Sequence, residues 1–262
     1  MDAKQAFDSG NLKGAIEAQT QKVKSAPGDT RARTFLFELL CFAGEWERAN
    51  KQLDALSVQE AQAAWGVQVY QNLLAAEKTR QKVFSEGVKP ETFIDQPAFL
   101  SLHLDAISKL REGNGAAATA LLEQSAAQQK PVKGELNGNP VSGLKNADDL
   151  LAPILEVMVM RDYVWVPWEQ VESLSVMPPQ RPRDLIWAAA KLTLTDGIQR
   201  SCYLPALYPG SSAADNDEAK LGRLTDWTQI DNGPVRGLGQ HLLMVGESDI
   251  GLLEVRTFTA EK

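Results

Sequence analysis

The residue types that could carry chemistry are few and dispersed along this sequence. The two histidines, His103 and His241, lie in separate apolar contexts. Neither has a second candidate ligand at the short spacings that are typical of zinc sites. The adjacent acids Asp148 and Asp149 fall at the start of an expected short helix, where carboxylates usually cap the helix and offset its dipole. We therefore expect no metal site and no cofactor.

Motifs for nucleophilic catalysis and phosphate binding are missing as well. No serine lies in a Gly-x-Ser-x-Gly elbow. Cys41 and Cys202 lie in different halves of the chain and form no motif with a histidine. The glycine-rich stretch 233–239 lacks the Lys-Ser/Thr ending of a phosphate-binding loop. The sequence thus favours a protein that is not an enzyme.

Composition narrows the classes of partner. The 262 residues are 44% hydrophobic and 23% charged, with a formal net charge of −7. These values are ordinary for a globular protein, and the negative charge argues against nucleic acid as the main partner. No uninterrupted apolar stretch approaches the ~18 residues of a membrane span, so we expect no membrane insertion. The first residues carry no secretory apolar region and cysteines are rare, which favours the cytoplasm.

The N-terminal half shows a repeated helical pattern. Gly10, Leu12 and Ala15 recur 34 residues later as Gly44, Trp46 and Ala49. This period, with a small residue at the turn, is typical of tetratricopeptide-type helix pairs. A further copy begins at Gly113 and ends at Pro131. Residues 1–131 are therefore predicted to form a tetratricopeptide-like helical repeat array. The apolar spacing predicts helices over residues 2–9, 12–24, 30–43, 45–56, 58–85, about 99–110 and 116–129.

The pattern changes after this array. Residues 132–160 are predicted to be a linker, rich in Gly, Pro and Asn, followed by a short helix that begins after Asp148. Residues 161–262 show strand-like rhythm. The predicted strands cover residues 163–168, 171–176, a hairpin of 185–195 with 198–204 across Asp196-Gly197, and a hairpin of 240–245 with 252–258. The fold class is thus α+β, with a small antiparallel, barrel-like β domain at the C-terminal end.

Several blocks of the C-terminal part occur together in a known family. They include Tyr-Val-Trp-Val-Pro-Trp at 163–168, Pro-Ala-Leu-Tyr-Pro-Gly-Ser at 205–211 and Gly-Pro-Val-Arg-Gly-Leu-Gly-Gln at 233–240. With the N-terminal repeats, the chain resembles the ImpE/TagJ (SciE-type) family of accessory proteins of bacterial type VI secretion systems. The resemblance implies a cytoplasmic, non-enzymatic adaptor. It implies that the adaptor binds the N-terminal helix of the small sheath subunit and connects contracted sheath with its AAA+ disassembly ATPase.

A helical array offers a groove that suits an amphipathic partner helix. Candidate protein-binding residues are the apolar side chains of the predicted array and the long or aromatic groups of the C-terminal loops, namely Leu12, Phe35, Leu39, Trp46, Arg223, Asp226, Trp227 and Arg236. Alternatively, Arg223 or Arg236 forms an internal ion pair with Asp226.

Two other functions stay open at this stage. The chain could be an assembly chaperone of another complex. It could also be an enzyme, in which case a deep polar pocket of the β domain should gather Arg223, Asp226, Arg236 and His241.

Overall fold

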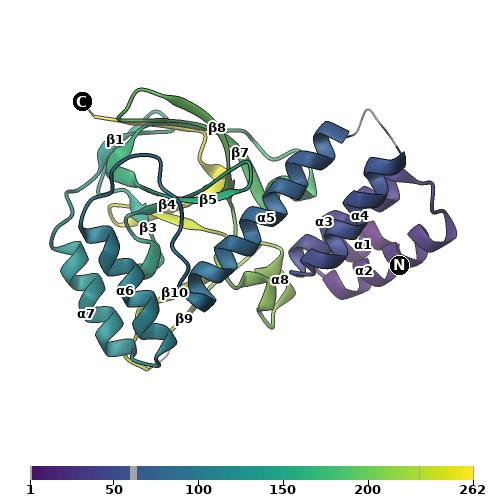
Figure 1. The fold of residues 1–262 in the computed structure, drawn as a ribbon, viewed down its shortest axis with the longest axis horizontal. Coiled ribbons are helices and arrows are strands. Elements are labelled where there is room, and N and C mark those ends of the chain that lie inside the picture. The colour runs from purple at the N-terminus through teal and green to yellow at the C-terminus, as the bar shows by residue number, and fades with distance from the viewer. Residues whose placement is uncertain (1, 60–63, 230, 262) are drawn as a thin grey trace.

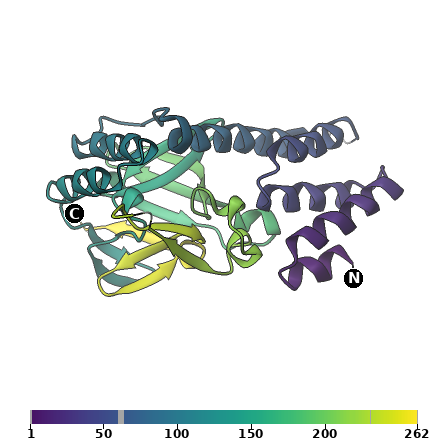
Figure 2. The same cartoon turned by 90° about the horizontal axis from the view of Figure 1, so that it is seen from below.

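A computed structural model of the chain describes residues 2–59, 64–229 and 231–261. Helices α1–α4 lie together at one end of the molecule, and the long helix α5 leads from them to a large sheet (Figure 1). Helices α6 and α7 lie at the opposite end, as the rotated view also shows (Figure 2). The helices are α1 (Ala3–Asp8), α2 (Leu12–Ser25), α3 (Thr30–Phe42), α4 (Trp46–Gln59), α5 (Ala64–Glu86), α6 (Phe99–Arg111), α7 (Gly115–Ala126) and the short α8 (Asp217–Lys220).

Three helix–helix turns share one glycine-based geometry. Gly10, Gly44 and Gly113 have φ angles of 81°, 68° and 74°, in the left-handed region that favours glycine. In each turn the amide of the residue after the glycine donates to the carbonyl five residues earlier, at 2.9 Å. This is the Schellman bond that satisfies an otherwise unpaired carbonyl at a helix end. The predicted role of these glycines is therefore confirmed.

The helices do not form one continuous array over residues 1–131. Helix α5 has 23 residues, and it contacts β4 and β5 of the sheet as well as α4. At ~1.5 Å per residue it spans about 35 Å, which separates the α6–α7 pair from α1–α4. The expectation of one array is wrong in this respect. The assignment of the helices to the tetratricopeptide class stays a prediction, and residues 60–63 of the predicted helix 58–85 lie outside the described residues.

The large sheet is antiparallel and open. Its eight strands follow the order β2-β1-β13-β6-β7-β8-β4-β5, so β2 and β5 form the two edges. The predicted barrel is wrong because these edge strands do not pair with each other. The strands of this sheet are β1 (Lys133–Leu136), β2 (Asn139–Ser142), β4 (Ile154–Val159), β5 (Asp162–Pro167), β6 (Val171–Val176), β7 (Trp187–Leu194), β8 (Gln199–Pro205) and β13 (Thr257–Ala260).

Two small sheets complete the architecture. One pairs β9 (Thr225–Thr228) with β10 (Arg236–Gly239), and the other has the order β12-β11-β3. The strands of the second are β3 (Lys145–Asn146), β11 (Leu242–Val245) and β12 (Ser248–Gly251).

The stretch 132–160, predicted as a linker and a short helix, contains strands β1–β4. The loop expectation was wrong because Asn137-Gly138 makes a hairpin turn. Both residues have positive φ, 50° and 81°, as the turn between β1 and β2 requires. The helix after Asp148 is one short 3-10 turn, Asp149–Leu151, and the apolar residues that follow it enter β4.

The hairpin around Asp196-Gly197 is confirmed, with β7 and β8 joined by residues 195–198. The second predicted hairpin is wrong in its partner strand. Strand β11 pairs with β12, whose residues were assigned to the turn. Residues 252–254 form a 3-10 turn, and β13 then joins the large sheet between β6 and β1. The Gly246 turn, at φ 61°, closes the chain back earlier than the apolar pattern suggested.

The sheet separates two hydrophobic cores. Alternate residues of β5 point to opposite faces. Tyr163 and Trp165 join the core that contains the helices, whereas Val164 and Val166 join the core around Trp168. No helix among the described residues is long and apolar enough to cross a membrane. The large sheet thus lies between the two cores, and the helices pack against one of its faces.

Candidate functional site

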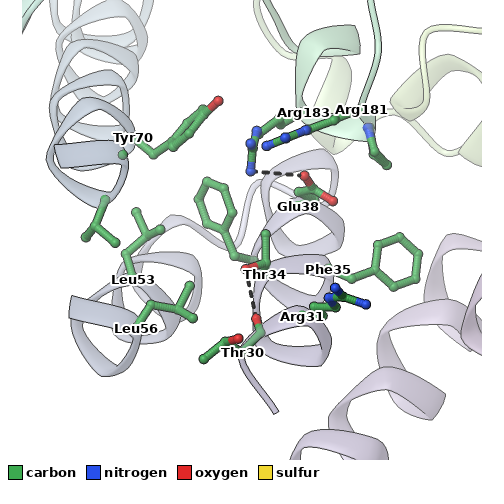
Figure 3. Close-up of a pocket in the computed structure, with 14 residues that line it drawn as sticks. Thr30, Arg31, Thr34, Phe35, Glu38, Leu53, Leu56, Tyr70, Arg181 and Arg183 are labelled. Carbon is green, nitrogen blue, oxygen red and sulfur yellow. Dashed lines mark hydrogen bonds and ion pairs between the residues drawn. The ribbon is translucent and has the colours of Figure 1, made fainter. Parts of the chain in front are cut away.

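A groove runs across the surface of α3, and α4, the start of α5 and residues 181–183 border it. Its volume is about 590 Å³. Figure 3 shows Leu53 and Leu56 pointing from α4 toward α3, with Phe35 and Arg31 on the other side of that helix. The apolar lining is Phe35, Phe37, Leu53, Leu56, Val67 and Tyr70. A surface of this shape and chemistry can hold the apolar side chains of a partner segment.

The local sequence explains how α3 serves both the groove and the core. Asp29 caps the helix by accepting from the amide of Ala32 at 2.9 Å. Residues 30, 31, 34, 35 and 38 follow helical spacing and line the groove. Leu36, Leu39 and Leu40 lie on the other faces and are buried. One face of the helix therefore lines the groove with polar and apolar side chains, while its leucines pack in the core.

Glu38 is the one acidic residue among the described residues that line the groove. The Glu38 side chain is 6% exposed, and its Oε1 lies 3.5 Å from Nη1 of Arg183 (Figure 3). Burial raises the pKa of Glu38 to about 7, and the positive charge of Arg183 opposes that rise. The Arg183 guanidinium also lies 4.6 Å from the ring centroid of Tyr70, a cation–π contact.

The predicted helical-half residues take different positions. Phe35 lines the groove, where its ring also makes an edge contact with Phe7 at 5.9 Å. Leu12 and Leu39 are buried in the core, so they position their helices and cannot contact a partner directly. Trp46 lines a separate cleft of about 500 Å³ beside residues 207–213. It packs on Trp187, with ring centroids 6.3 Å apart.

The predicted C-terminal arginines bind inside the protein, but not to Asp226. Arg223 donates to the carbonyls of Phe7 at 2.7 Å and Asp8 at 3.1 Å, at the end of α1. Arg236 Nε lies 2.9 Å from Oδ2 of the buried Asp148. The alternative pairings of Arg223 or Arg236 with Asp226 are therefore wrong. Asp226 and Trp227 are exposed on β9.

A buried ionic network lies behind these elements. Arg80 of α5 binds Glu156 of β4 through two contacts, at 2.7 and 3.0 Å. His241 Nε2 lies 3.0 Å from the second oxygen of the same carboxylate, and the Tyr163 hydroxyl donates to the first. Arg80 also donates to the carbonyl of Leu207 at 2.7 Å. All the side chains of the network are nearly inaccessible, so the helix and the sheet share one compensated buried charge cluster.

The two glycine- and proline-rich blocks close over this network. The ring of Tyr208, from the first block, stacks on His241 with centroids 4.0 Å apart. Gly237, from the second block, lies so close that an added Cβ would be 2.3 Å from that tyrosine ring. Its amide donates to Asp148 at 2.9 Å. These blocks are thus explained by close packing between loops.

The residues whose gathering would indicate an enzyme do not meet. His241 is enclosed by the network, and Arg236 binds Asp148. Arg223 binds the end of α1, while Asp226 is exposed.

Sequence reasoning missed Glu38, Arg80, Glu156 and Arg183. A usable signal existed for two of them. Glu38 interrupts the apolar run 35–42, and Glu156 interrupts 154–159. A single charge inside an apolar run indicates a buried group that needs a partner. The partner itself could not be identified, because Arg80 and Glu156 are 76 residues apart.

Comparisons with known proteins agree with this architecture. A family model described as ImpE protein matches residues 138–259. The type VI secretion system accessory component TagJ of Pseudomonas aeruginosa is 36% identical over 263 residues, covering 100% of this chain and 92% of TagJ. A crystal structure of a Vibrio parahaemolyticus protein has a TM-score of 0.92 at 22% identity, covering 99% of this chain and 97% of that one, and shows the same fold. By its full-length identity to TagJ and its ImpE match, the chain belongs to the ImpE/TagJ family.

Proposed function

We propose that this chain is a non-enzymatic, cytoplasmic accessory protein of a type VI secretion system. In this role it holds the N-terminal helix of the small sheath subunit and links contracted sheath to the AAA+ ATPase that disassembles it. The observation that carries the proposal is the groove across α3, which combines an apolar lining with the charged residues Arg31, Glu38, Arg181 and Arg183. The full-length similarity to TagJ supports the assignment to this secretion system.

A helix is the partner that suits this groove. Most of its lining residues come from α3, α4 and α5, and residues 181–183 complete it, so the groove is a seam between surface elements rather than a closed cavity. An amphipathic helix lays side chains at i, i+3, i+4 and i+7 into such a seam. About 590 Å³ accommodates several such side chains, since ligand pockets usually range over ~300–1,000 Å³.

The test is a blocking substitution with a matched control. Thr34 lies at the centre of the groove, and its hydroxyl donates to the carbonyl of Thr30 at 2.8 Å within its own helix (Figure 3). Thr34→Arg should fill the groove without opening a core cavity. Thr79→Arg is the control, because Thr79 is also half-buried on a helix and also donates to the carbonyl four residues earlier.

We expect wild-type and Thr79→Arg protein to bind a peptide of the sheath-subunit N-terminal helix with similar affinity by isothermal titration calorimetry. Thr34→Arg should weaken this binding by more than about tenfold, which corresponds to the loss of ~1.4 kcal/mol of contact energy. If Thr34→Arg binds the peptide as tightly as the wild-type chain does, the binding site lies elsewhere on the protein. No binding of the peptide by the wild-type chain would contradict the sheath role and favour an assembly chaperone of another complex.

The ATPase link needs a separate measurement. If the chain links the two, a pull-down with the chain as bait should retain the ATPase even when sheath subunits are absent. Retention only when sheath subunits are present would mean that the sheath itself connects the chain to the ATPase, and would contradict the proposed link.

A further inference from the structure

The charged side chains of the groove are mostly arginines. Three arginines, Arg31, Arg181 and Arg183, and one acid, Glu38, line it. The formal charge of the lining is therefore +2 on a chain whose net charge is −7. The groove therefore has the opposite sign of charge from the chain as a whole, and it would attract an acidic partner that the rest of the surface repels.

These arginines have little to bind inside the protein. Within the described part of the chain, the guanidinium groups of Arg31, Arg181 and Arg183 donate no hydrogen bond, and the buried Nε of Arg183 has no partner. Arg33, on the same helix as Arg31, donates to Gln52 at 3.0 Å and to the carbonyl of Pro27 at 2.9 Å, although its buried Nε, like that of Arg183, has no hydrogen-bond partner. A guanidinium offers five donors in a fork that matches a carboxylate, so buried arginines are normally paired. Arg31 and Arg181 are exposed and can be hydrated, so Arg183 is the arginine that needs a partner, since its side chain is only 12% exposed and its terminal nitrogens make one long contact with Glu38.

The contact of Arg183 with Glu38 does not satisfy it. The distance of 3.5 Å is long for a charge-assisted hydrogen bond, which is usually ~2.7–2.9 Å. The contact joins one Nη atom to one oxygen, whereas an arginine can bind a carboxylate through two parallel hydrogen bonds. Arg183 therefore keeps binding capacity toward the groove.

We propose that the groove selects an acidic amphipathic helix, whose carboxylates bind Arg183 and Arg181 beside the apolar lining, and that Glu38 competes with the incoming carboxylate for Arg183. This inference rests on the proposed function only for the choice of the natural occupant. It names Arg181 and Arg183 as the determinants of partner specificity.

The competition makes binding depend on pH. An incoming carboxylate beside Glu38 favours the protonated form of Glu38, because two like charges would otherwise share one arginine. Since the pKa of Glu38 is about 7, the affinity for an acidic helix should rise as the pH falls from 8 to 6. The titratable and charged groups around Glu38 are Arg181, Arg183, Asp184, Tyr70 and Cys41. Tyr70 and Cys41 have raised pKa values and stay neutral over this range.

Two probes test the inference separately from the sheath role. The first is the sheath-subunit N-terminal peptide. The second is a host helix of about 20 residues with a leucine stripe and flanking glutamates, paired with a copy in which glutamines replace the glutamates. Binding is measured by fluorescence anisotropy at pH 6, 7 and 8 to the wild-type chain and to Arg183→Gln, Arg181→Gln and Glu38→Gln. Arg48→Gln, on an exposed residue of α4 outside the groove, is the matched control.

The glutamate host helix should bind about tenfold more tightly than the glutamine copy at pH 7, and Arg183→Gln should remove most of this difference. Glu38→Gln should tighten binding several-fold and abolish the pH dependence. Arg183→Lys keeps the charge but loses the fork, so it should recover only part of the preference. Circular dichroism of each variant shows whether a lost preference reflects lost folding.

Each outcome decides one of the two proposals. Equal binding of the two host helices would overturn the inference, because the groove would then not distinguish acidic from neutral helices. Weaker binding after Glu38→Gln would also overturn it and would indicate that the groove takes a basic segment. A sheath peptide that binds the wild-type chain and both arginine variants equally would overturn the inference and leave the sheath role standing. A sheath peptide that fails while the glutamate helix binds through Arg183 would leave the inference standing without the sheath role. Failure of every helix to bind would overturn both.

Discussion

Replacing Glu156 by glutamine tests whether the buried network holds the helical half on the sheet. The carboxylate accepts two hydrogen bonds from Arg80 and one from Tyr163, and it contacts His241. Removing one charge of a buried pair usually costs ~3–5 kcal/mol, since the other charge stays buried without its counterion. Arg80 would keep Glu77 at 3.2 Å and the Leu207 carbonyl, so we expect a loss of about 3 kcal/mol in the free energy of unfolding.

Urea unfolding followed by tryptophan fluorescence measures this loss. With a urea m-value of about 3 kcal/mol/M, the midpoint of Glu156→Gln should fall by about 1 M. Glu123→Gln, on the exposed surface of α7, is the control and should leave the midpoint unchanged. A fall of less than about 0.3 M for Glu156→Gln would refute the view that this ion pair stabilises the contact between α5 and the sheet.

The pH dependence gives the same prediction a second check. Burial alone would raise the pKa of Glu156, but the charge of Arg80 and the hydrogen bonds from His241 and Arg80 outweigh burial, so the pKa lies well below its ordinary value of 4.5. The contribution of the carboxylate is therefore present above pH 4.5 and is lost as the pH falls below it. The stability difference between wild type and Glu156→Gln should shrink by about 1.4 kcal/mol per pH unit below that value.

Three further predictions concern single positions. Gly237→Ala should lower stability by ~1–3 kcal/mol in thermal unfolding, because its Cβ would lie 2.3 Å from the Tyr208 ring, whereas Gly28→Ala meets no atom within 4 Å and should be neutral. Glu38→Gln should stabilise the chain by up to ~3 kcal/mol at pH 8 and by little at pH 4.5, since burial raises the pKa of Glu38 from 4.5 to about 7; an equal effect at both pH values would contradict this. Burial lowers the pKa of His103 from 6.5 to about 4, so wild type should lose ~3 kcal/mol more than His103→Gln between pH 6.5 and 4 in denaturant titrations, and parallel pH profiles would refute it.

The helices could be predicted from sequence because their ends carry local signals. Asn11, Asp29 and Asn114 cap helices through their side chains, and glycines end three of the helices. The strand pairing could be predicted only where the turn and the strands were adjacent, as in the hairpin at Asp196-Gly197. Strand β13 was paired with the wrong partner, because its neighbours β1 and β6 are far away in sequence.

The sequence predicted that a groove between the helices would be the candidate site, but not which residues line it. Helical spacing indicated a groove and included Phe35, but it could not separate Leu39, which is fully buried, from residues that face outward. Arg183 comes from a segment about 150 residues from α3, so its place beside Glu38 depends on the tertiary fold. The same limit hid Arg80 and Glu156.

Helix α5 connects the family-specific blocks to the groove. Val67 and Tyr70, near the start of this helix, line the groove, and Arg80 lies in the buried network. These positions are about 15–20 Å apart along one rigid helix. The blocks at 205–211 and 233–240 enclose the network through Tyr208 and Gly237, and the Leu207 carbonyl binds Arg80 directly. Their structural effect is therefore to fix α5, and with it one wall of the groove. If the groove holds a partner helix as proposed, the C-terminal blocks support that binding without touching the partner, because a displaced α5 would alter the spacing between Tyr70 and Arg183.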